Sequence, residues 1–541
     1  MNIGANIRKL TLLFIVLFLA LSGGLVYWQV IVSKQVASNP HNNRACLYEN
    51  APLRGRIFDR NGVLLADSQP NQDARCGYMR HYYEPSLAGL IGYYAGPNYP
   101  STGLEHQFDA YLTGQVGATE LENQMNHLLH QSPVGNDLYL TIDVRIQRIV
   151  NQHFDDPVQI VDNSTFKTDR GSVIVTNPQT GEILAMLSRP GYDPNRMVQT
   201  LVKGNLSYYN QLANDPIGKP LRWRPTQETY APGSVYKTVT LMAGLNEGKT
   251  TLDQSFDQQH ALGPIFYNGQ QIGPVGNNIG GYTSKFPVTT EYGFTHSDNV
   301  IFAQIGVNTG SDKWLAFNKK FYIGEQIPFD LPVTPSTVLP AGTQTLADNQ
   351  LAANAFGQGY NSITPFQMSL FDNAAAANGK LMHPMLVAKI TNHDGSALQT
   401  FTPEQLSAPL SEKAATDTRK AMYGVTYCGS GSIERVRING SPWGIISKTG
   451  TAQVSDNESI PAQSWLITQA PYSVNNPSQL PALTIVAMKE NGGEGGAQNG
   501  PMLTAMYNDI FTKIDTYKGL KAPGPAAPTY CCSAKLLQIG C

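Results

Sequence analysis

Three short strings along the chain carry residue types that could perform acyl transfer through a serine. They are Ser234-Val-Tyr-Lys237, Ser297-Asp-Asn299 and Lys448-Thr-Gly450, in that order. The first offers a hydroxyl with a lysine three positions on, a spacing that places both side chains on one helix face. The second offers a hydroxyl and an amide, and the third offers another cation. Together they contain the nucleophile, proton carriers and carboxylate-binding strand of an acyl-serine enzyme.

The surroundings of Ser234 predict the N-terminus of a helix. Pro232-Gly233 stops the preceding segment, apolar residues recur at helical spacing as far as Leu245, and Gly248 marks the end. Free N–H groups and the positive end of the helix dipole favour the negative charge that develops at such a serine. Lys237 can act as its base only if burial or a neighbouring cation lowers its pKa. By itself, the string more often marks a solvent-facing serine and lysine on a helix, a pairing found in most proteins.

The second string lies directly before residues 300–303, where a helix is predicted to start. Ser297 could relay protons to a leaving group, and Asn299 could hold Lys237 or a substrate carbonyl. Because Ser, Asp and Asn are also the preferred helix N-caps, a plain cap is an alternative interpretation. His296 suggests a Ser–His pair, but no G-x-S-x-G elbow surrounds the first string, so an α/β-hydrolase triad is disfavoured.

The third string follows residues 443–447 and is expected at the end of a strand. Alternation along a strand would turn Lys448 and Gly450 to one face. If Gly450 faces the nucleophile, its missing side chain leaves room for a peptide along the strand edge. Thr449 and Thr451 supply hydroxyls for a terminal carboxylate. The Thr451 N–H, with that of the serine, would form an oxyanion hole. The alternative is a loop glycine after an edge strand.

Other motifs are weaker. Glycines in residues 492–496 lack the Lys-Ser/Thr of a phosphate loop and are interpreted as a flexible connection before a last helix. His127 and His130 have the spacing of a metal pair, but residues 120–130 are typical of an ordinary amphipathic helix, so no metal is expected. A formal net charge of −2 gives no electrostatic case for nucleic acid. No cofactor is expected.

The elements that must position the three strings form an α+β or α/β pattern. A hairpin is predicted at residues 54–66, around Asn61-Gly62, and a strand and helix follow over residues 137–151. Further strands are predicted early and late in the chain, with helices between them. Such an order predicts that both ends of this domain pair in one antiparallel sheet with a helical lobe inserted. The predicted segments are 171–176, 182–188, 443–447, 464–468 and 483–488, followed by a final helix at 501–517.

The N-terminal segment predicts a membrane anchor. Residues 10–33 carry no charge and follow Arg8 and Lys9. As a helix they would reach about 36 Å, which is enough to cross a hydrocarbon core of ~30 Å. Tyr27-Trp28 sits where aromatic rings prefer the interface. The basic flank predicts a cytoplasmic N-terminus and an extracytoplasmic body. A cleaved signal peptide, with residues 20–22 as its site, is the alternative.

With these strings and segments, the chain resembles the class B penicillin-binding proteins, the D,D-transpeptidases of the cell wall. Two places depart from the family pattern, residues 221–224, where Asn-Arg-Ala is common, and residues 464–466, after the third string. No glycosyltransferase domain precedes the strings, and the short members without PASTA modules match best. The remaining shared segments are residues 54–62, 103–105, 140–143, 178–185, 357–359 and 364–367.

The resemblance implies a multidomain chain with a penicillin-binding transpeptidase fold. In this fold an antiparallel sheet is flanked by helices and joined to an all-helical lobe. The tail from 518 is rich in Pro, Ala and Cys and is expected to be poorly ordered. The six cysteines lie outside the membrane and can form disulfides, but the sequence does not choose the pairing of Cys46, Cys76, Cys428, Cys531, Cys532 and Cys541. The expected regions are a cytoplasmic tail (1–9), an anchor (10–33), an irregular pedestal domain (34–165), the transpeptidase domain (166–517) and the tail (518–541).

The resemblance also implies a two-step reaction. Ser234 would attack the penultimate D-alanine carbonyl of a peptidoglycan stem peptide while Lys237 takes the proton, and an amine of a neighbouring stem peptide would then accept the acyl group. Ser297, Asn299 and Lys448 would assist. β-Lactams would trap the serine, and a membrane polymerase of the shape, elongation, division and sporulation (SEDS) type would be a partner. A D,D-carboxypeptidase, a β-lactam hydrolase or a non-catalytic scaffold remain alternatives, and the cellular process served stays open.

Overall fold

The structure is a computed structural model. It describes residues 3–33, 53–74, 77–116, 134–156, 165–272, 285–429, 441–453, 460–523 and 528–536. Two sequence predictions fall outside these ranges. One is the helix over residues 120–130 with its two histidines, and the other is that Cys46, Cys76 and Cys541 can form disulfides, whose pairing the sequence leaves open.

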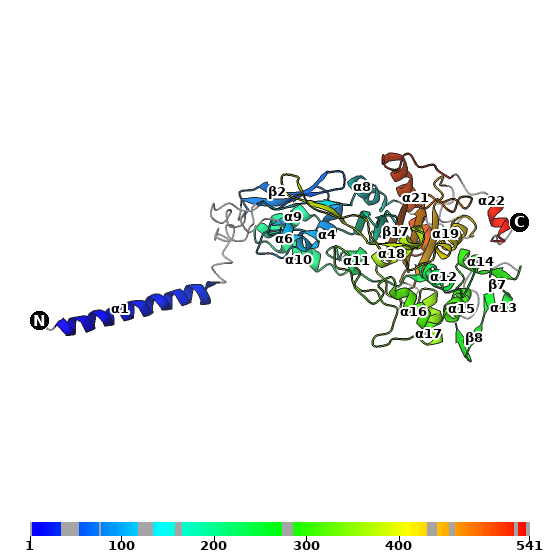
Figure 1. Ribbon diagram of the computed structural model, residues 1–541, viewed down its shortest axis with the longest axis horizontal. Helices are drawn as coiled ribbons and strands as arrows, with labels where there is room; N and C mark the ends of the chain where they lie inside the picture. Colours follow the sequence, from blue (N-terminus) through cyan, green and yellow to red (C-terminus); the bar gives the residue numbers. More distant parts are fainter. Residues whose placement is uncertain are drawn as a thin grey trace.

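The N-terminal helix lies apart from the packed body (Figure 1). Helix α1 (Ile3–Val26) continues into a π-helical turn, Tyr27–Ile31. The window Ile7–Ile31 is long and apolar enough to cross a membrane, and none of it is buried against the protein. An apolar surface of this size left uncovered suits lipid better than water, so the helix is consistent with a single-pass anchor.

The pedestal is built on a six-stranded sheet with the order β13-β12-β4-β1-β2-β3. The predicted hairpin is confirmed, because β1 and β2 pair antiparallel across a turn in which Gly62 has a φ of +81°. Strands β12 and β13 come from the middle of the chain, and β12 pairs with β4. The boundary at 165/166 stays a prediction, since the pedestal sheet also takes in this later segment. The strands are β1 (Ile57–Phe58), β2 (Leu64–Pro70), β3 (Tyr78–Tyr82), β4 (Asp137–Leu140), β12 (Val387–Thr391) and β13 (Ala397–Thr400).

The second sheet has five antiparallel strands in the order β15-β16-β17-β5-β6. Late strand β17 pairs with early strand β5, so the prediction that the two ends of the domain share one sheet is confirmed. Side chains alternate between two cores. Val173 and Val175 enter one core, and Ile174 enters the other. The strands are β5 (Gly171–Thr176), β6 (Ile183–Arg189), β15 (Ile446–Ala452), β16 (Gln463–Ala470) and β17 (Leu483–Lys489).

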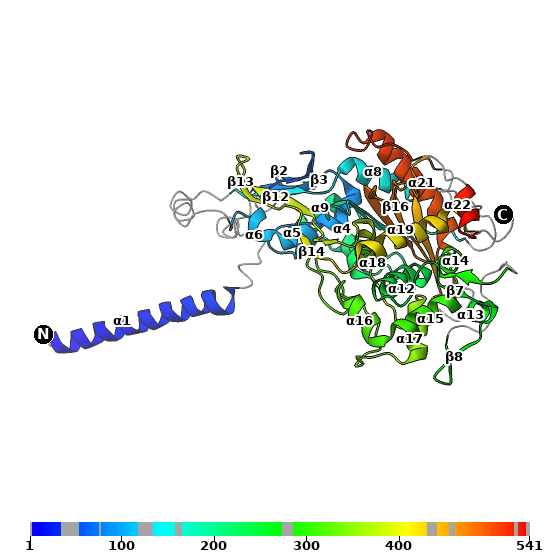
Figure 2. The ribbon, with the colours of Figure 1, turned by 45° about the vertical axis from the view of Figure 1, so that its right-hand side comes forward.

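Helices cover both faces of this sheet (Figures 1 and 2). Helices α8 (Val144–His153) and α21 (Gly495–Lys513) pack on one face, and α18 (Pro365–Ala376) and α19 (Glu412–Tyr427) pack on the other. The prediction of a flexible glycine connection before the last helix is wrong. Gly492 and Gly493 are buried, and a Cβ on Gly495 would lie 2.2 Å from the Gly450 carbonyl oxygen. These glycines allow α21 to begin tightly against β15, six residues earlier than predicted.

The helical lobe packs around α12, which follows the first string. Its members are α12 (Lys237–Asn246), α14 (Thr290–Thr295), α15 (Asn299–Thr309), α16 (Ser311–Lys319) and α17 (Asp348–Ala355). The remaining helices are Pro85–Leu87, Ala88–Ile91, Gly103–Gln107, Asp109–Leu112, Pro194–Val202, Ser207–Ala213, Arg224–Gln227 and Gln258–Leu262. Short strands lie at Ser255–Phe256, Ile265–Tyr267, Gln270–Ile272, Val288–Thr289, Leu381–Met382 and Gln405–Ser407.

The C-terminal tail is ordered over residues 528–536, so the prediction of a poorly ordered tail is wrong there. It forms helix α22 (Pro528–Ser533), and Cys531 is joined to Cys428 by a disulfide. The side chain of Leu536 is fully buried. Composition alone could not reveal this, because the order comes from a cross-link between residues 103 positions apart.

Candidate active site

The first string forms a tightly held turn at the start of α12, as predicted. Ser234 lies in a 3₁₀ turn, η3 (Gly233–Tyr236), that leads directly into α12. Gly233 has a φ of +58°, and its N–H donates to the Gly357 carbonyl at 3.0 Å. From β16, the Trp465 Nε1–H donates to the Ala231 carbonyl at 3.0 Å. Ser234 itself is half-buried, so the hydroxyl sits on a rigid turn and can still be reached from outside.

The side-chain nitrogen of Lys237 lies within hydrogen-bond distance of residues from both the first and the second string. Its Nζ lies 2.8 Å from Ser234 Oγ, 2.8 Å from the Ser297 carbonyl oxygen, 3.1 Å from Ser297 Oγ and 2.6 Å from Asn299 Oδ1. The carbonyl and the amide oxygen can only accept hydrogen bonds. They therefore take both N–H groups of a neutral lysine, and its lone pair remains for the Ser234 hydroxyl proton. This arrangement suits a general base.

Burial makes the neutral lysine favourable. The Lys237 side chain is fully buried, and this desolvation, together with the nearby Lys448 cation, lowers its pKa well below 10.5. Asp298 opposes the shift and does not outweigh it. Desolvation also lowers the pKa of Lys448, to about 7, against the attraction of Glu494. The Lys448 cation and burial thus both discourage a charge on Lys237.

The second string is a helix cap and part of the site at once. The Asp298 carboxylate caps α15 by accepting from the Ile301 N–H at 2.9 Å, so the alternative interpretation holds for this residue. Ser297 adopts a left-handed backbone with a φ of +59°, which costs a non-glycine residue on the order of 1 kcal/mol. The strained turn directs its hydroxyl between the two lysines, 2.9 Å from Lys448 Nζ. The Asp298 cap therefore fixes the position of the chain, and the left-handed backbone of Ser297 directs its hydroxyl towards the two lysines.

The third string lies inside β15, whereas the sequence predicted it at the end of a strand. Strand β15 begins at Ile446 and continues through Ala452, and it is the edge strand of its sheet in the described part of the chain. Lys448 is fully buried, Thr449 is half-buried and Thr451 is exposed. An edge strand offers unpaired backbone groups to an extended peptide, in keeping with the predicted roles of Thr449 and Thr451.

Gly450 is needed for a different reason from the one predicted. A Cβ there would lie 2.9 Å from the Pro232 carbonyl oxygen, 2.9 Å from Val235 Cγ1 and 3.0 Å from the Val235 nitrogen. The missing side chain therefore lets β15 pack against the nucleophile turn, and it does not make room for the peptide. The close approach brings the strand edge to the serine.

Replacing Gly450 with alanine is expected to push β15 away from the nucleophile turn. Overpacking of this kind costs about 1–3 kcal/mol, and a displaced strand should slow acylation by β-lactams roughly 10- to 100-fold. Thermal unfolding and the acylation rate measure the two effects. Gly519→Ala is the matched control, because a Cβ there meets nothing within 4 Å. Acylation at the wild-type rate in Gly450→Ala would contradict this account.

Comparison with known proteins agrees with this geometry. A family model described as the penicillin-binding protein transpeptidase domain matches residues 171–510, and one described as the penicillin-binding protein A dimerisation domain matches residues 54–138. The chain belongs to the class B penicillin-binding proteins. The family and fold predicted from the three strings are thus confirmed, as is the enzyme class, a serine D,D-transpeptidase.

Sequence similarity to known proteins extends along most of this penicillin-binding protein. It is 30% identical over 512 residues to the peptidoglycan D,D-transpeptidase PbpA of Mycolicibacterium smegmatis, covering 92% of this chain and 96% of that protein. It is 26% identical over 504 residues to MrdA of Escherichia coli K12, covering 83% of this chain and 74% of MrdA. The structure of penicillin-binding protein A from M. tuberculosis as an imipenem acyl-enzyme matches with a TM-score of 0.72 and 27% identity, covering 85% of this chain and 99% of that one.

Several residues that contact the site of this penicillin-binding protein are not predicted from the sequence. The Phe294 ring lies 5.5 Å from Lys448 Nζ and gives the cation an aromatic face. Trp465 and Gly357 hold the nucleophile turn, and Glu494 attracts Lys448 from the start of α21. Gly357 lies in a segment that supports the family resemblance and Trp465 lies in one that departs from the family pattern, but nothing in their type or spacing indicates these contacts. No motif or spacing in the sequence indicates a role for Glu494 or Phe294.

Proposed function

We propose that this penicillin-binding protein cross-links peptidoglycan with Ser234 as the nucleophile and Lys237 as its base. The observation that carries the proposal is the Lys237 amine, which is buried and lies within hydrogen-bond distance of Ser234, Ser297 and Asn299. A serine hydroxyl is a weak nucleophile without such a partner.

In the acylation step, Ser234 Oγ attacks the carbonyl carbon of the penultimate D-alanine, and its proton passes to Lys237 Nζ. The backbone N–H groups of Ser234 and Thr451 stabilise the oxyanion, and such donors are each worth ~3–4 kcal/mol. When the C–N bond breaks, the proton moves from Lys237 through Ser297 to the nitrogen of the departing D-alanine. The distances of 3.1 Å and 2.9 Å from Ser297 Oγ to the two lysine nitrogens support this relay.

In the second step, an amine from a neighbouring stem peptide attacks the acyl-serine. Lys237, neutral again, takes a proton from the incoming amine and returns it to Ser234 Oγ, 2.8 Å away, as the amide bond forms and the ester bond to Ser234 breaks. Before the acylation step, Thr449, Thr451 and the Lys448 charge bind the terminal carboxylate of the donor, which belongs to the D-alanine that departs. We also infer that β-lactams acylate Ser234, because the M. tuberculosis relative is described as an acyl-enzyme complex with imipenem and with penicillin G.

The anchor sets where this reaction occurs. Arg8 and Lys9 precede the apolar helix and favour a cytoplasmic N-terminus, which places the catalytic domain outside the membrane. A membrane-embedded glycan polymerase of the SEDS type is a suitable partner, since cross-linking needs freshly made glycan strands beside the anchor.

A D-alanine exchange assay tests the proposal. The full chain in detergent is incubated with an acylated peptide ending in D-Ala-D-Ala and with isotope-labelled D-alanine, and the products are resolved by mass spectrometry. Labelled D-Ala-D-Ala peptide is the expected main product, together with a long-lived benzylpenicillin adduct. Rapid benzylpenicillin turnover or only the shortened peptide would instead establish a hydrolase or carboxypeptidase. No adduct and no product would establish a non-catalytic scaffold.

A further inference from the structure

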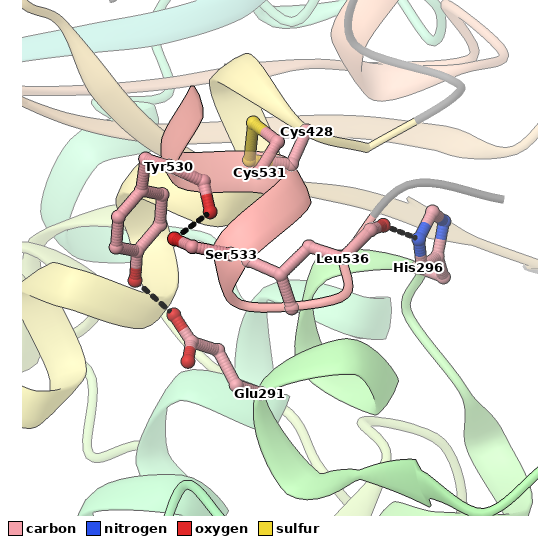
Figure 3. Close-up of a disulfide and its surroundings, with 7 residues drawn as sticks. All are labelled: Glu291, His296, Cys428, Tyr530, Cys531, Ser533 and Leu536. Atoms are coloured by element: carbon pink, nitrogen blue, oxygen red, sulfur yellow. Dashed lines mark hydrogen bonds between the residues drawn. A yellow bond between two sulfur atoms is a disulfide. The ribbon is translucent and has the colours of Figure 1, made fainter. Parts of the chain in front are cut away.

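The ordered part of the C-terminal tail lies against the helix that leads into the second string (Figure 3). The disulfide between Cys531 of α22 and Cys428 at the end of α19 fixes the tail to the body. The Tyr530 ring packs edge-on against Tyr423 of α19, with 5.2 Å between ring centroids. The segment is therefore held by a covalent bond and by aromatic packing on one helix of the transpeptidase core.

Two hydrogen bonds connect this segment to α14 and to the residue that follows it. The Tyr530 hydroxyl donates to Glu291 Oε1 at 2.5 Å, near the start of α14. The Leu536 carbonyl oxygen lies 2.7 Å from His296 Nε2, just after the end of α14. The tail thus contacts α14 at both ends (Figure 3).

His296 depends on the tail for its polar contact. Its partner is a carbonyl oxygen, so Nε2 must carry the proton and donate. Nδ1 is buried and has no hydrogen-bond partner among the described residues. The ring is 6% exposed and packs on Tyr292, with 4.2 Å between ring centroids. Without the Leu536 carbonyl, both ring nitrogens would be buried with no partner in the described structure, which is costly.

The position of His296 matters because Ser297 follows it. Ser297 holds a strained left-handed backbone, and a strained conformation persists only where its surroundings enforce it. On one side the Ser297 N–H donates to the Phe294 carbonyl at 3.1 Å. On the other side Asp298 caps α15. The Asp298 N–H also donates to the Gly293 carbonyl at 2.7 Å. The buried His296 ring is a further support, and the tail holds it in place.

We propose that the disulfide-held C-terminal segment is a positioning element of the active site, which acts through the Leu536–His296 hydrogen bond to keep Ser297 between the two lysines. The proposal rests on the role of Ser297 in the proposed function. His296 is a positioning residue and does not touch the reacting atoms. The alternative is that the disulfide only stabilises the fold, which would leave the geometry around Ser297 unchanged when the cross-link is removed.

The test compares wild type with Cys428→Ser/Cys531→Ser and with a pair at the histidine. His296→Gln keeps an N–H donor for the Leu536 carbonyl, and His296→Leu removes it. Ser533→Ala is the control, since its hydroxyl donates to the Tyr530 carbonyl inside α22. The readouts are hydrogen exchange of peptides covering residues 290–299 and the benzylpenicillin acylation rate constant, with active sites counted by titration.

We expect faster exchange over residues 290–299 in the double serine variant and in His296→Leu, and near wild-type exchange in His296→Gln and Ser533→Ala. The first two should acylate ~10- to 100-fold more slowly, with unchanged affinity for the initial complex and a full count of active sites. Unchanged exchange and rate in both, whatever happens to the melting temperature, would overturn the proposal. If the double serine variant does not fold, the comparison of His296→Gln with His296→Leu still tests the proposal. Because exchange is measured without substrate, a wild type that is never acylated would refute the proposed function and not this positioning role.

Discussion

Replacing Ser234 with alanine is expected to abolish covalent labelling by β-lactams and to leave the fold intact. The hydroxyl is the only group removed, and it lies on a half-buried turn whose shape is set by Gly233, Gly357 and Trp465. Loss of the nucleophile in serine enzymes of this general type lowers the rate by roughly 10⁶-fold. Fluorescent penicillin labelling on gels, read beside thermal unfolding, makes the measurement.

The matched control is Ser478→Ala, an exposed serine whose hydroxyl donates to Asn476 Oδ1. It should label like wild type. Label that persists on Ser234→Ala would mean that another residue carries the acyl group, and the assignment of the three strings would then be wrong. Growth supported by Ser234→Ala in cells lacking the wild-type copy would point to a scaffold.

Local patterns predicted most of what lies near each string. The i, i+3 spacing of Ser234 and Lys237, and the β-branched runs of β5 and β17, depend on neighbouring residues and are visible in the sequence. The order of the strands also predicts that β5 and β17 share a sheet, but several side-chain contacts between distant residues are not visible in the sequence. The Lys448–Ser297 hydrogen bond joins residues 151 positions apart, and the His296–Leu536 bond joins residues 240 apart. Such pairs depend on tertiary packing, for which composition and periodicity carry no signal.

The errors have the same origin. The sequence predicts that Gly450 leaves room for a peptide and that residues 492–496 are a flexible connection, whereas Gly450 and Gly495 are needed because two backbones approach each other. A tail rich in Pro, Ala and Cys was interpreted by its composition, whereas a disulfide and the burial of Leu536 hold it on the core. In both cases, a partner elsewhere in the fold decided the local structure.

Replacing Lys237 with methionine is expected to inactivate the enzyme and to stabilise it. Loss of the base should slow acylation by roughly 10²- to 10⁴-fold. The folded pKa of Lys237 lies well below its unfolded value, so between these two values the unfolded chain binds more protons and folding loses stability as the pH falls. Methionine removes this cost and the repulsion from Lys448. We therefore expect a melting temperature a few degrees above wild type at neutral pH, with a difference that shrinks as the pH rises. Methionine also leaves the Ser297 carbonyl and Asn299 Oδ1 without their donor, a cost that does not depend on pH. A stability difference that stays constant as the pH rises would therefore contradict the depressed pKa of the buried amine.

The pH dependence of wild-type acylation follows from the same two lysines. Lys237 acts as a base only when deprotonated, so the rate should rise with pH and level off well below pH 10.5. Lys448, with a pKa of about 7, loses its charge within this range, which weakens its hold on a carboxylate and should lower the rate again at higher pH. In Lys448→Met, the repelling cation is gone, so the pKa of Lys237 should rise and the ascending limb of the rate profile should move to higher pH. Stopped-flow acylation between pH 5 and 10 measures both limbs. An ascending limb that stays in place in Lys448→Met would show that the two lysines are not coupled and that the depressed pKa of Lys237 comes from burial alone.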